Sequence, residues 1–216
     1  MNKHNENVRK VKSFYINVKI HCHLVQINRI NFIKKAKPMK YLLSALLMLI
    51  MFTSASPVKQ KTIHDFKIKS IEGETINFSK YKGKKLLIVN TASKCGYTPQ
   101  YKALEQLQQK FEGKLVVIGF PSDNFGGQEF QQNSEIKEFC QKNYGVTFPL
   151  TTRVDVKGEN ATPIFKYLCD KSANGVLDAK IGWNFNKFII DENGKLLAYF
   201  DSKTKPDSPE ILKYLQ

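Results

Sequence analysis

Hydrophobic and polar positions alternate over residues 63–78, around the polar pair Glu72-Gly73, and this pattern predicts a β-hairpin. Two nearly continuous apolar runs follow at 85–92 and 114–121, and such runs are typical of strands that are buried on both faces of a sheet. Between them, apolar residues recur at helical spacing over 101–111, which predicts an amphipathic helix. The first half of the chain therefore indicates a hairpin followed by a strand–helix–strand unit.

The second half of the chain continues with both kinds of element. The pattern predicts a helix over 134–145 and a strand over 146–158, and a short helix begins at Pro163, since proline is favoured in a first helical turn. A second hairpin turns at 192–194, and a last helix is expected over 208–216. A βαβ half followed by a ββα half is the thioredoxin-like arrangement, so we predict an α/β domain with a central mixed sheet flanked by helices.

A further apolar run, at 41–52, lies near the N-terminus and has a different character. Lys40 precedes it and small residues occupy 53–56 after it, an arrangement that is typical of a secretory signal peptide. The run is short for a membrane span, which needs about 20 residues. We therefore expect the chain to be exported, to the periplasm or outside the cell.

This reading divides the chain into three parts. We expect a thioredoxin-like domain over 57–216, preceded by a signal peptide over 39–56. We expect translation to start at Met39, so that the basic segment 1–38 is the product of an over-long gene prediction. The alternative is a protein anchored in the membrane through residues 41–52, with the basic segment as a cytoplasmic tail.

The charge and the histidine content exclude several classes of function. Although the formal charge is +15, residues 1–40 hold ten Lys and Arg against one acid, and the later lysines are interspersed with acids. No basic stripe with interleaved aromatic residues occurs, so nucleic-acid binding is not expected. His64 is the only histidine after the signal, and no two cysteines are close there, so we expect no metal, no cofactor and no hydrolase triad.

A single cysteine, Cys95, lies where the first apolar run gives way to the predicted helix, in the stretch NTASKCGYTPQY. A cation and a helix N-terminus lower the pKa of a thiol, and Lys94 and the Thr98-Pro99 helix start are expected to supply them. Thr98 stands where a thioredoxin-like dithiol has its second cysteine, so a CxxC motif is excluded. From its placement alone, Cys95 is either a reactive thiol or a buried filler.

Four separated blocks resemble the signature sequences of the glutathione peroxidase family, in its cysteine form. They read NTASKCGYTPQY, GFPSDNFGGQEF, EFCQKNYGVTFPL and WNFNKFIIDENGK, and they match in order over about residues 62–216. The resemblance implies a thioredoxin-like fold and a peroxidase that reduces hydrogen peroxide and organic hydroperoxides, as in an oxidative stress response.

The resemblance also implies the catalytic residues. Cys95 matches the cysteine that replaces selenocysteine, and Gln128, Trp183 and Asn184 match the other members of the family's catalytic tetrad. The Cys95 thiolate would attack the peroxide and become a sulfenic acid, while the three neutral side chains donate hydrogen bonds to the thiolate and to the peroxide oxygens. Without the resemblance, Trp183 would be read as a core aromatic and Gln128 as a solvated loop residue.

Cys140 matches the resolving cysteine of the family's thioredoxin-dependent members. It would condense with the Cys95 sulfenic acid to form a redox-active disulfide, and its helix would have to unwind locally if the two sulfurs start far apart. The alternative is a buried helical cysteine. The segment after Pro149 is short, whereas the family's tetrameric, glutathione-using members have extra sequence there, and Arg153 is the only arginine after residue 29. The resemblance is therefore to the monomeric, thioredoxin-using branch, which implies a thioredoxin-like reductant, with glutathione as the other donor.

Some positions depart from the family pattern or leave the function open. The usual loop cysteine is Ser122, and Asp123 beside it adds a negative charge that would oppose a thiolate at Cys95. Cys169 matches no family role. Besides the enzyme, two alternatives remain at this stage: a peroxide sensor that passes a disulfide to a client protein, and a thioredoxin-fold binding module without activity.

Overall fold

The structure, a computed structural model, describes residues 60–216. The expected extension over 1–38, the signal peptide over 39–56 and the potential anchor at 41–52 all lie outside the described residues. Among the helices of the described part, none has the length and hydropathy that crossing a membrane requires.

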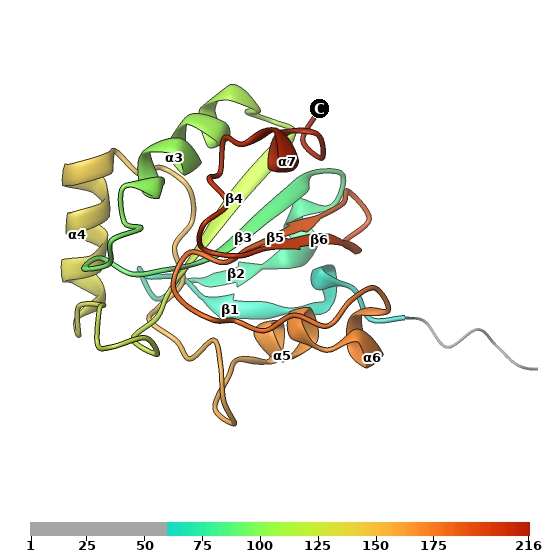
Figure 1. Cartoon of the computed structure of the whole chain (residues 1–216), viewed down its shortest axis with the longest axis horizontal. Coiled ribbons are helices and arrows are strands. Elements are labelled where there is room, and N and C mark those ends of the chain that lie inside the picture. The colour runs from blue at the N-terminus through green and yellow to red at the C-terminus, as the bar shows by residue number, and fades with distance from the viewer. Residues whose placement is uncertain (1–59) are drawn as a thin grey trace, which may run out of the picture. The chain divides into compact units, whose positions relative to one another are not determined.

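A four-stranded mixed sheet forms the centre of this domain (Figure 1). Its strands are β3 (Lys85–Thr91), β4 (Leu115–Pro121), β5 (Lys187–Ile190) and β6 (Leu196–Phe200), and they lie in the order β4-β3-β5-β6. Strand β3 is parallel to β4, whereas β5 is antiparallel to both β3 and β6. The predicted α/β fold with a central mixed sheet is thus confirmed.

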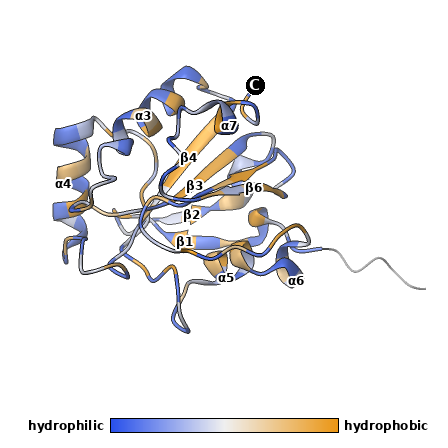
Figure 2. Ribbon diagram, in the orientation of Figure 1, coloured by the Kyte–Doolittle hydropathy of each residue, from blue (hydrophilic) through white to orange (hydrophobic). Residues whose placement is uncertain are grey.

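Two hydrophobic cores lie on the two faces of the sheet, because successive side chains of a strand point to opposite faces. In β3, Leu86 and Ile88 belong to one core and Leu87 and Val89 to the other. Strand β4 is buried along its whole length, which explains its continuous apolar sequence (Figure 2).

Different elements cover the two faces (Figure 1). One core includes residues of α3 (Gln100–Lys110), α4 (Asn133–Tyr144) and α7 (Pro209–Leu212). The other includes residues of α5 (Pro163–Cys169) and of the hairpin formed by β1 (Lys67–Lys69) and β2 (Thr75–Asn77). Helix α6 (Lys171–Asn174) and the 3₁₀ turns η1 (Ile63–Asp65) and η2 (Phe78–Tyr81) complete the element order.

The strand expected over 146–158 does not form. The segment forms two isolated β-bridges and no continuous ladder, between Leu150 and Gly119 and between Thr151 and Ser70, although further backbone hydrogen bonds join it to its neighbours. Pro149 has no N–H to offer to a strand ladder, which favours an irregular path. A Cβ atom at Gly119 would lie 2.6 Å from Leu150 Cδ2, so the glycine leaves room for the Leu150 side chain where the segment packs on β4.

Candidate active site

Cys95 lies in a tight turn between β3 and α3, and 7% of its surface is exposed. The backbone N–H of Tyr97 donates a hydrogen bond to the Cys95 sulfur over 3.4 Å. The Thr98 hydroxyl accepts from the Cys95 N–H at 3.0 Å and donates to the carbonyl of Ala92 at 2.8 Å. Thr98, at the position of the missing second cysteine, thus holds the turn that carries the first.

The helix starts directly after the Thr98-Pro99 pair, as the sequence indicated. Helix α3 begins at Gln100, with Pro99 as its N-cap, because Thr98 takes part in the turn that precedes it. The ammonium of Lys94 lies 4.1 Å from the ring centroid of Phe130 in a cation–π contact. The Cys95 sulfur accepts its hydrogen bond from the Tyr97 amide.

Gln128 lies against the segment that leads to Cys95. The backbone N–H of Lys94 donates to the Gln128 carbonyl over 2.9 Å. The side-chain amide of Asn184 donates to Gln128 Oε1 over 3.0 Å. Two hydrogen bonds therefore connect the Cys95 turn, Gln128 and Asn184, which are far apart in the sequence.

Trp183 precedes Asn184 and is a surface residue rather than a core aromatic. Its surface is 41% exposed, and its ring lies 5.7 Å from that of Phe125. Together with Tyr97 and Tyr199, it lines a cavity of about 470 Å³. A second cavity, of about 380 Å³, shares the Tyr97 wall. Tyr97, in the Cys95 turn, therefore borders two cavities, and the indole of Trp183 lines one of them.

Asn90 and Asn186 hold the loop that carries Trp183 and Asn184, and the sequence analysis missed both. Asn90, fully buried in β3, donates to the Trp183 carbonyl at 3.0 Å and accepts from the Asn186 N–H at 2.8 Å. Its own carbonyl accepts from the Phe185 N–H at 2.6 Å. The only signal in the sequence was an asparagine inside an apolar strand.

The charge of Asp123 is paired. Its carboxylate accepts a hydrogen bond from Arg153 at 2.9 Å and from the Gln131 side chain at 3.2 Å. Ser122, where the family has a cysteine, is fully buried and its hydroxyl donates to Asn124. The departure from the family loop thus introduces an ion pair rather than an isolated negative charge.

Glu129 is a second residue that the sequence analysis missed. It is 1% exposed, and its Oε1 accepts hydrogen bonds from the backbone N–H groups of Ser93 and Phe130, at 3.2 and 2.8 Å. Burial raises the pKa of its carboxyl group above the usual value. The carboxyl group of Glu129 thereby ties the segment that precedes Cys95 to the Gln128 segment.

Cys140 lies fully buried in α4, and the three cysteines of the described part are free thiols. Burial raises the pKa of the Cys140 thiol to about 12, against a smaller opposite effect of the Tyr101 hydroxyl. Cys169, at the end of α5, is half-buried, and burial raises the pKa of its thiol to about 11. In this state Cys140 is a protonated core residue.

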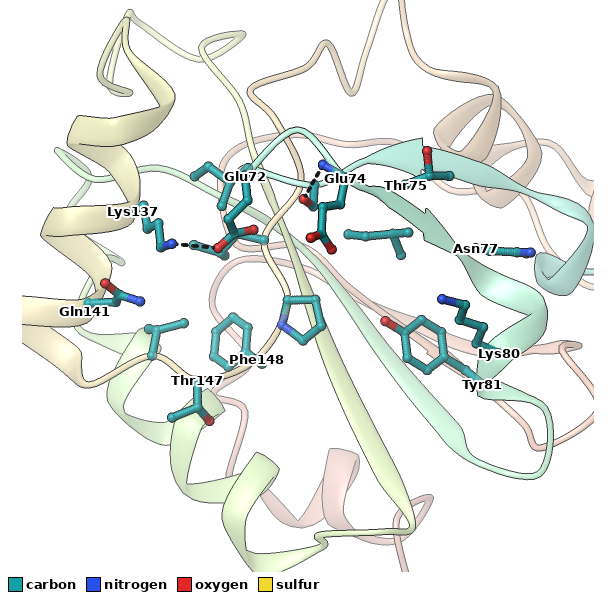
Figure 3. A pocket seen from close by; sticks show the side chains of 16 residues that line it. Glu72, Glu74, Thr75, Asn77, Lys80, Tyr81, Lys137, Gln141, Thr147 and Phe148 are labelled. Atoms are coloured by element: carbon teal, nitrogen blue, oxygen red, sulfur yellow. Dashed lines mark hydrogen bonds and ion pairs between the residues drawn. The ribbon is translucent and has the colours of Figure 1, made fainter.

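Another cavity, of about 440 Å³, lies between α4 and the β1–β2 hairpin, with Glu72, Phe148 and Lys137 in its wall (Figure 3). None of Cys95, Gln128, Trp183 and Asn184 lines it. Among residues 60–216, no group of three or more His, Cys, Asp and Glu side chains is placed to hold a metal ion.

Comparisons with known proteins agree with the motifs. The family model described as glutathione peroxidase matches residues 63–169. Glutathione peroxidase-like peroxiredoxin 2 of Saccharomyces cerevisiae is 50% identical over 149 residues, covering 68% of this chain and 91% of the relative. The glutathione peroxidase of Lactococcus lactis is 45% identical over 148 residues, covering 68% of this chain and 94% of the relative.

A solved structure agrees with these sequence relatives. The crystal structure of Trgpx in apo form superposes with a TM-score of 0.56 at 34% identity, over 72% of this chain and 95% of that chain. The chain belongs to the glutathione peroxidase family.

Proposed function

We propose that Cys95 is the residue through which this peroxidase reduces hydroperoxides. The chain is a thiol peroxidase by family. In the proposed step, the Cys95 thiolate attacks the terminal oxygen of ROOH and the O–O bond breaks. Cys95 becomes a sulfenic acid, and ROH leaves with a proton from solvent. The sulfur is oxidised by two electrons and the peroxide is reduced by two.

The hydrogen bonds that connect the Cys95 turn, Gln128 and Asn184 are the observation that carries this proposal. Because Gln128 Oε1 accepts from Asn184, the Gln128 NH₂ group is directed away from that bond and is available to a peroxide oxygen. The indole N–H of Trp183 is a further donor at the exposed cavity. Donors in fixed positions stabilise the negative charge that develops on the leaving oxygen.

Cys140 is the proposed resolving residue. Its thiol would replace the hydroxyl of the Cys95 sulfenic acid, so that a disulfide forms and water leaves. A fully buried thiol with a pKa of about 12 is a poor nucleophile. We therefore infer that α4 opens locally, and that Cys140 ionises once it reaches solvent.

A thioredoxin-like protein is the proposed reductant of this disulfide. Arg153 is the only arginine in the described part of the chain, and Asp123 already pairs with it. The site therefore offers no free guanidinium for a glutathione carboxylate. We propose further that the protein acts as a monomer and is exported by the signal at 39–56, with an anchor at 41–52 as the alternative.

Coupled turnover of the full-length protein tests the proposal. We expect NADPH consumption with hydrogen peroxide and cumene hydroperoxide in the presence of thioredoxin and its reductase, and less with glutathione and its reductase. Cys95→Ser should abolish turnover. Cys140→Ser should allow each enzyme molecule to oxidise Cys95 once, without further turnover, and Cys169→Ser is the matched control. Turnover that survives in Cys95→Ser would reject the assignment of the attacking sulfur.

Two further measurements test the remaining steps. Mass spectrometry of peroxide-treated protein should find the Cys95 and Cys140 peptides linked, and a Cys95 sulfinic acid beside a free Cys140 thiol would reject the resolving step. N-terminal sequencing of protein from the host should begin near residues 56–58. Recovery of residues 1–38 would contradict the expected start and cleavage.

A further inference from the structure

Lys187 is the only lysine with a fully buried side chain in the described part of the chain. It lies on β5, and its ammonium donates hydrogen bonds to the backbone carbonyls of Asp201, Ser202 and Thr204, at 3.3, 3.5 and 2.5 Å. An ammonium has three N–H donors, and three carbonyl oxygens therefore match it. We call residues 201–204, which follow β6, the 201–204 turn.

Burying this cation is costly. Burial lowers the pKa of Lys187 to about 7, while the negative charge of Asp201 raises it. The Asp201 carboxylate itself accepts from the backbone N–H groups of Lys203 and Thr204, so it organises the turn from within. A buried charge is tolerated where its donors are satisfied, and here the acceptors all belong to one turn.

The 201–204 turn contacts both parts of the candidate site. The Ser202 hydroxyl donates to the backbone carbonyl of Asn184 over 2.5 Å. The Ser202 carbonyl also accepts from the side chain of Gln100, the first residue of α3, at 2.8 Å. One turn thus joins the loop that bears Asn184 to the start of the helix that follows Cys95.

The Asn184 loop needs such support. Phe185, the next residue, has a φ of 62°, in the left-handed region that residues other than glycine rarely adopt. Strained backbone persists only where its surroundings determine the conformation. Asn90 holds this loop from β3, and Ser202 holds it from the side of the 201–204 turn.

We propose that Lys187 is a positioning residue of the peroxidase reaction, which fixes Asn184 and Trp183 relative to Cys95 through the 201–204 turn. Lys187 does not touch the peroxide. It holds the turn, the turn holds the Asn184 carbonyl through Ser202, and Asn184 orients Gln128. This inference rests on the proposed roles of Cys95, Gln128 and Asn184.

The first test is Lys187→Met in the full-length chain, which keeps most of the apolar stem and removes the donors. Lys195→Met is the matched control, because Lys195 is exposed on the same hairpin. Stopped-flow mixing should show that Lys187→Met lowers the second-order rate constant for Cys95 oxidation by about tenfold to a hundredfold, the effect of a small misplacement of catalytic groups. The later step, disulfide formation from the sulfenic acid, should keep its rate.

Fluorescence gives a readout that needs no activity. Trp183 is the only tryptophan of the chain, so its emission reports on the Asn184 loop alone. We expect a shifted emission maximum and stronger quenching by acrylamide in Lys187→Met, and neither change in Lys195→Met. A folded Lys187→Met protein with the wild-type rate constant and wild-type emission would overturn the proposal, as would equal losses in both chemical steps.

A second variant decides the question if Lys187→Met does not fold. Ser202→Ala removes only the hydroxyl that reaches Asn184, and it should lower the same rate constant and shift the same emission. An unchanged Ser202→Ala would overturn the proposed connection. Where both variants fold, their effects should be less than additive, because they interrupt one chain of contacts. If the wild type does not react with peroxide, the proposed function fails, and fluorescence alone decides the positioning role.

Discussion

Asn184 donates its side-chain amide to Gln128 Oε1 over 3.0 Å, although 56 positions separate the two residues in the sequence. This bond sets the orientation of the Gln128 amide, since an amide whose oxygen accepts one bond turns its NH₂ group the other way. Asn184 is fully buried and Gln128 is half-buried, so the pair lies at the boundary between the core and solvent.

Replacing Asn184 by alanine should therefore slow the reaction of Cys95 with peroxide. The Gln128 amide would lose its fixed orientation, and removal of one preorganised donor costs roughly a hundredfold in rate. The rate of Cys95 oxidation under single-turnover conditions measures the effect, with Asn193→Ala in the exposed β5–β6 turn as the control. The double variant with Gln128→Ala should be hardly slower than either single variant, and fully additive losses would contradict the coupling.

Asp123→Asn should leave the rate of Cys95 oxidation within about twofold of the wild-type value, as expected for a substitution whose charge is already compensated. The sequence alone suggested that Asp123 opposes a thiolate, but Arg153 lies 2.9 Å from its carboxylate. Arg153→Met should have the larger effect, because it leaves the Asp123 charge without its partner. An Asp123→Asn enzyme that is tenfold faster would show that the charge does act on Cys95.

The order of strands and helices was predictable because burial on both faces leaves a direct trace in the sequence. Strand β4 is apolar along its length and β3 over its four central residues 86–89 for this reason. The segment 146–158 was read wrongly as a strand. Its backbone forms β-bridges only at Leu150 and Thr151, and its local apolar pattern cannot reveal how few residues pair.

The candidate site was predictable only in part. Cys95 was conspicuous at the end of a buried run, whereas Gln128, Trp183 and Asn184 entered through the resemblance to a family. The residues that hold them, Asn90 and Lys187 above all, are polar positions in strands. Their role depends on which carbonyls the fold brings to them, and no local pattern encodes those partners.

The resolving step should speed up with pH beyond the usual range of a thiol. Cys140 has a pKa of about 12 in the closed state, against 9.0 for a thiol in solvent. A raised pKa of an acid means that the closed state binds its proton more tightly. The stabilisation of the closed state by the Cys140 proton is therefore fully present below pH 9.0. Above pH 9.0, the free energy of opening α4 falls by about 1.4 kcal/mol per pH unit.

Sequential mixing tests this pH dependence in a Cys169→Ser background. Once Cys95 has been oxidised, the rate of disulfide formation should keep rising through pH 9.0 and show no plateau up to about pH 10.5. A rate that levels off near pH 9.0 would mean that Cys140 is already exposed in the oxidised enzyme, with no closed state to open. Such a result would contradict the opening of α4 as a step of the cycle.

Lys137 and Glu72 form an ion pair of 3.0 Å that joins α4 to the β1–β2 hairpin across a cavity wall (Figure 3). Both side chains are partly exposed, at 38% and 48%, so the pair is worth about 0.2–1 kcal/mol. If α4 must open before Cys140 reacts, Lys137→Met should accelerate disulfide formation by about 1.4-fold to fivefold, the rate equivalent of that free energy. Glu72→Gln should act in the same direction, and the double variant should add little. Lys166→Met, an exposed charge change on α5, is the control.

Added salt screens an exposed ion pair, so 0.5 M NaCl (about five times the ionic strength of an ordinary assay) should accelerate the wild type and leave Lys137→Met nearly unchanged. A wild-type rate that ignores salt, together with an unaltered Lys137→Met, would show that this contact does not restrain the helix.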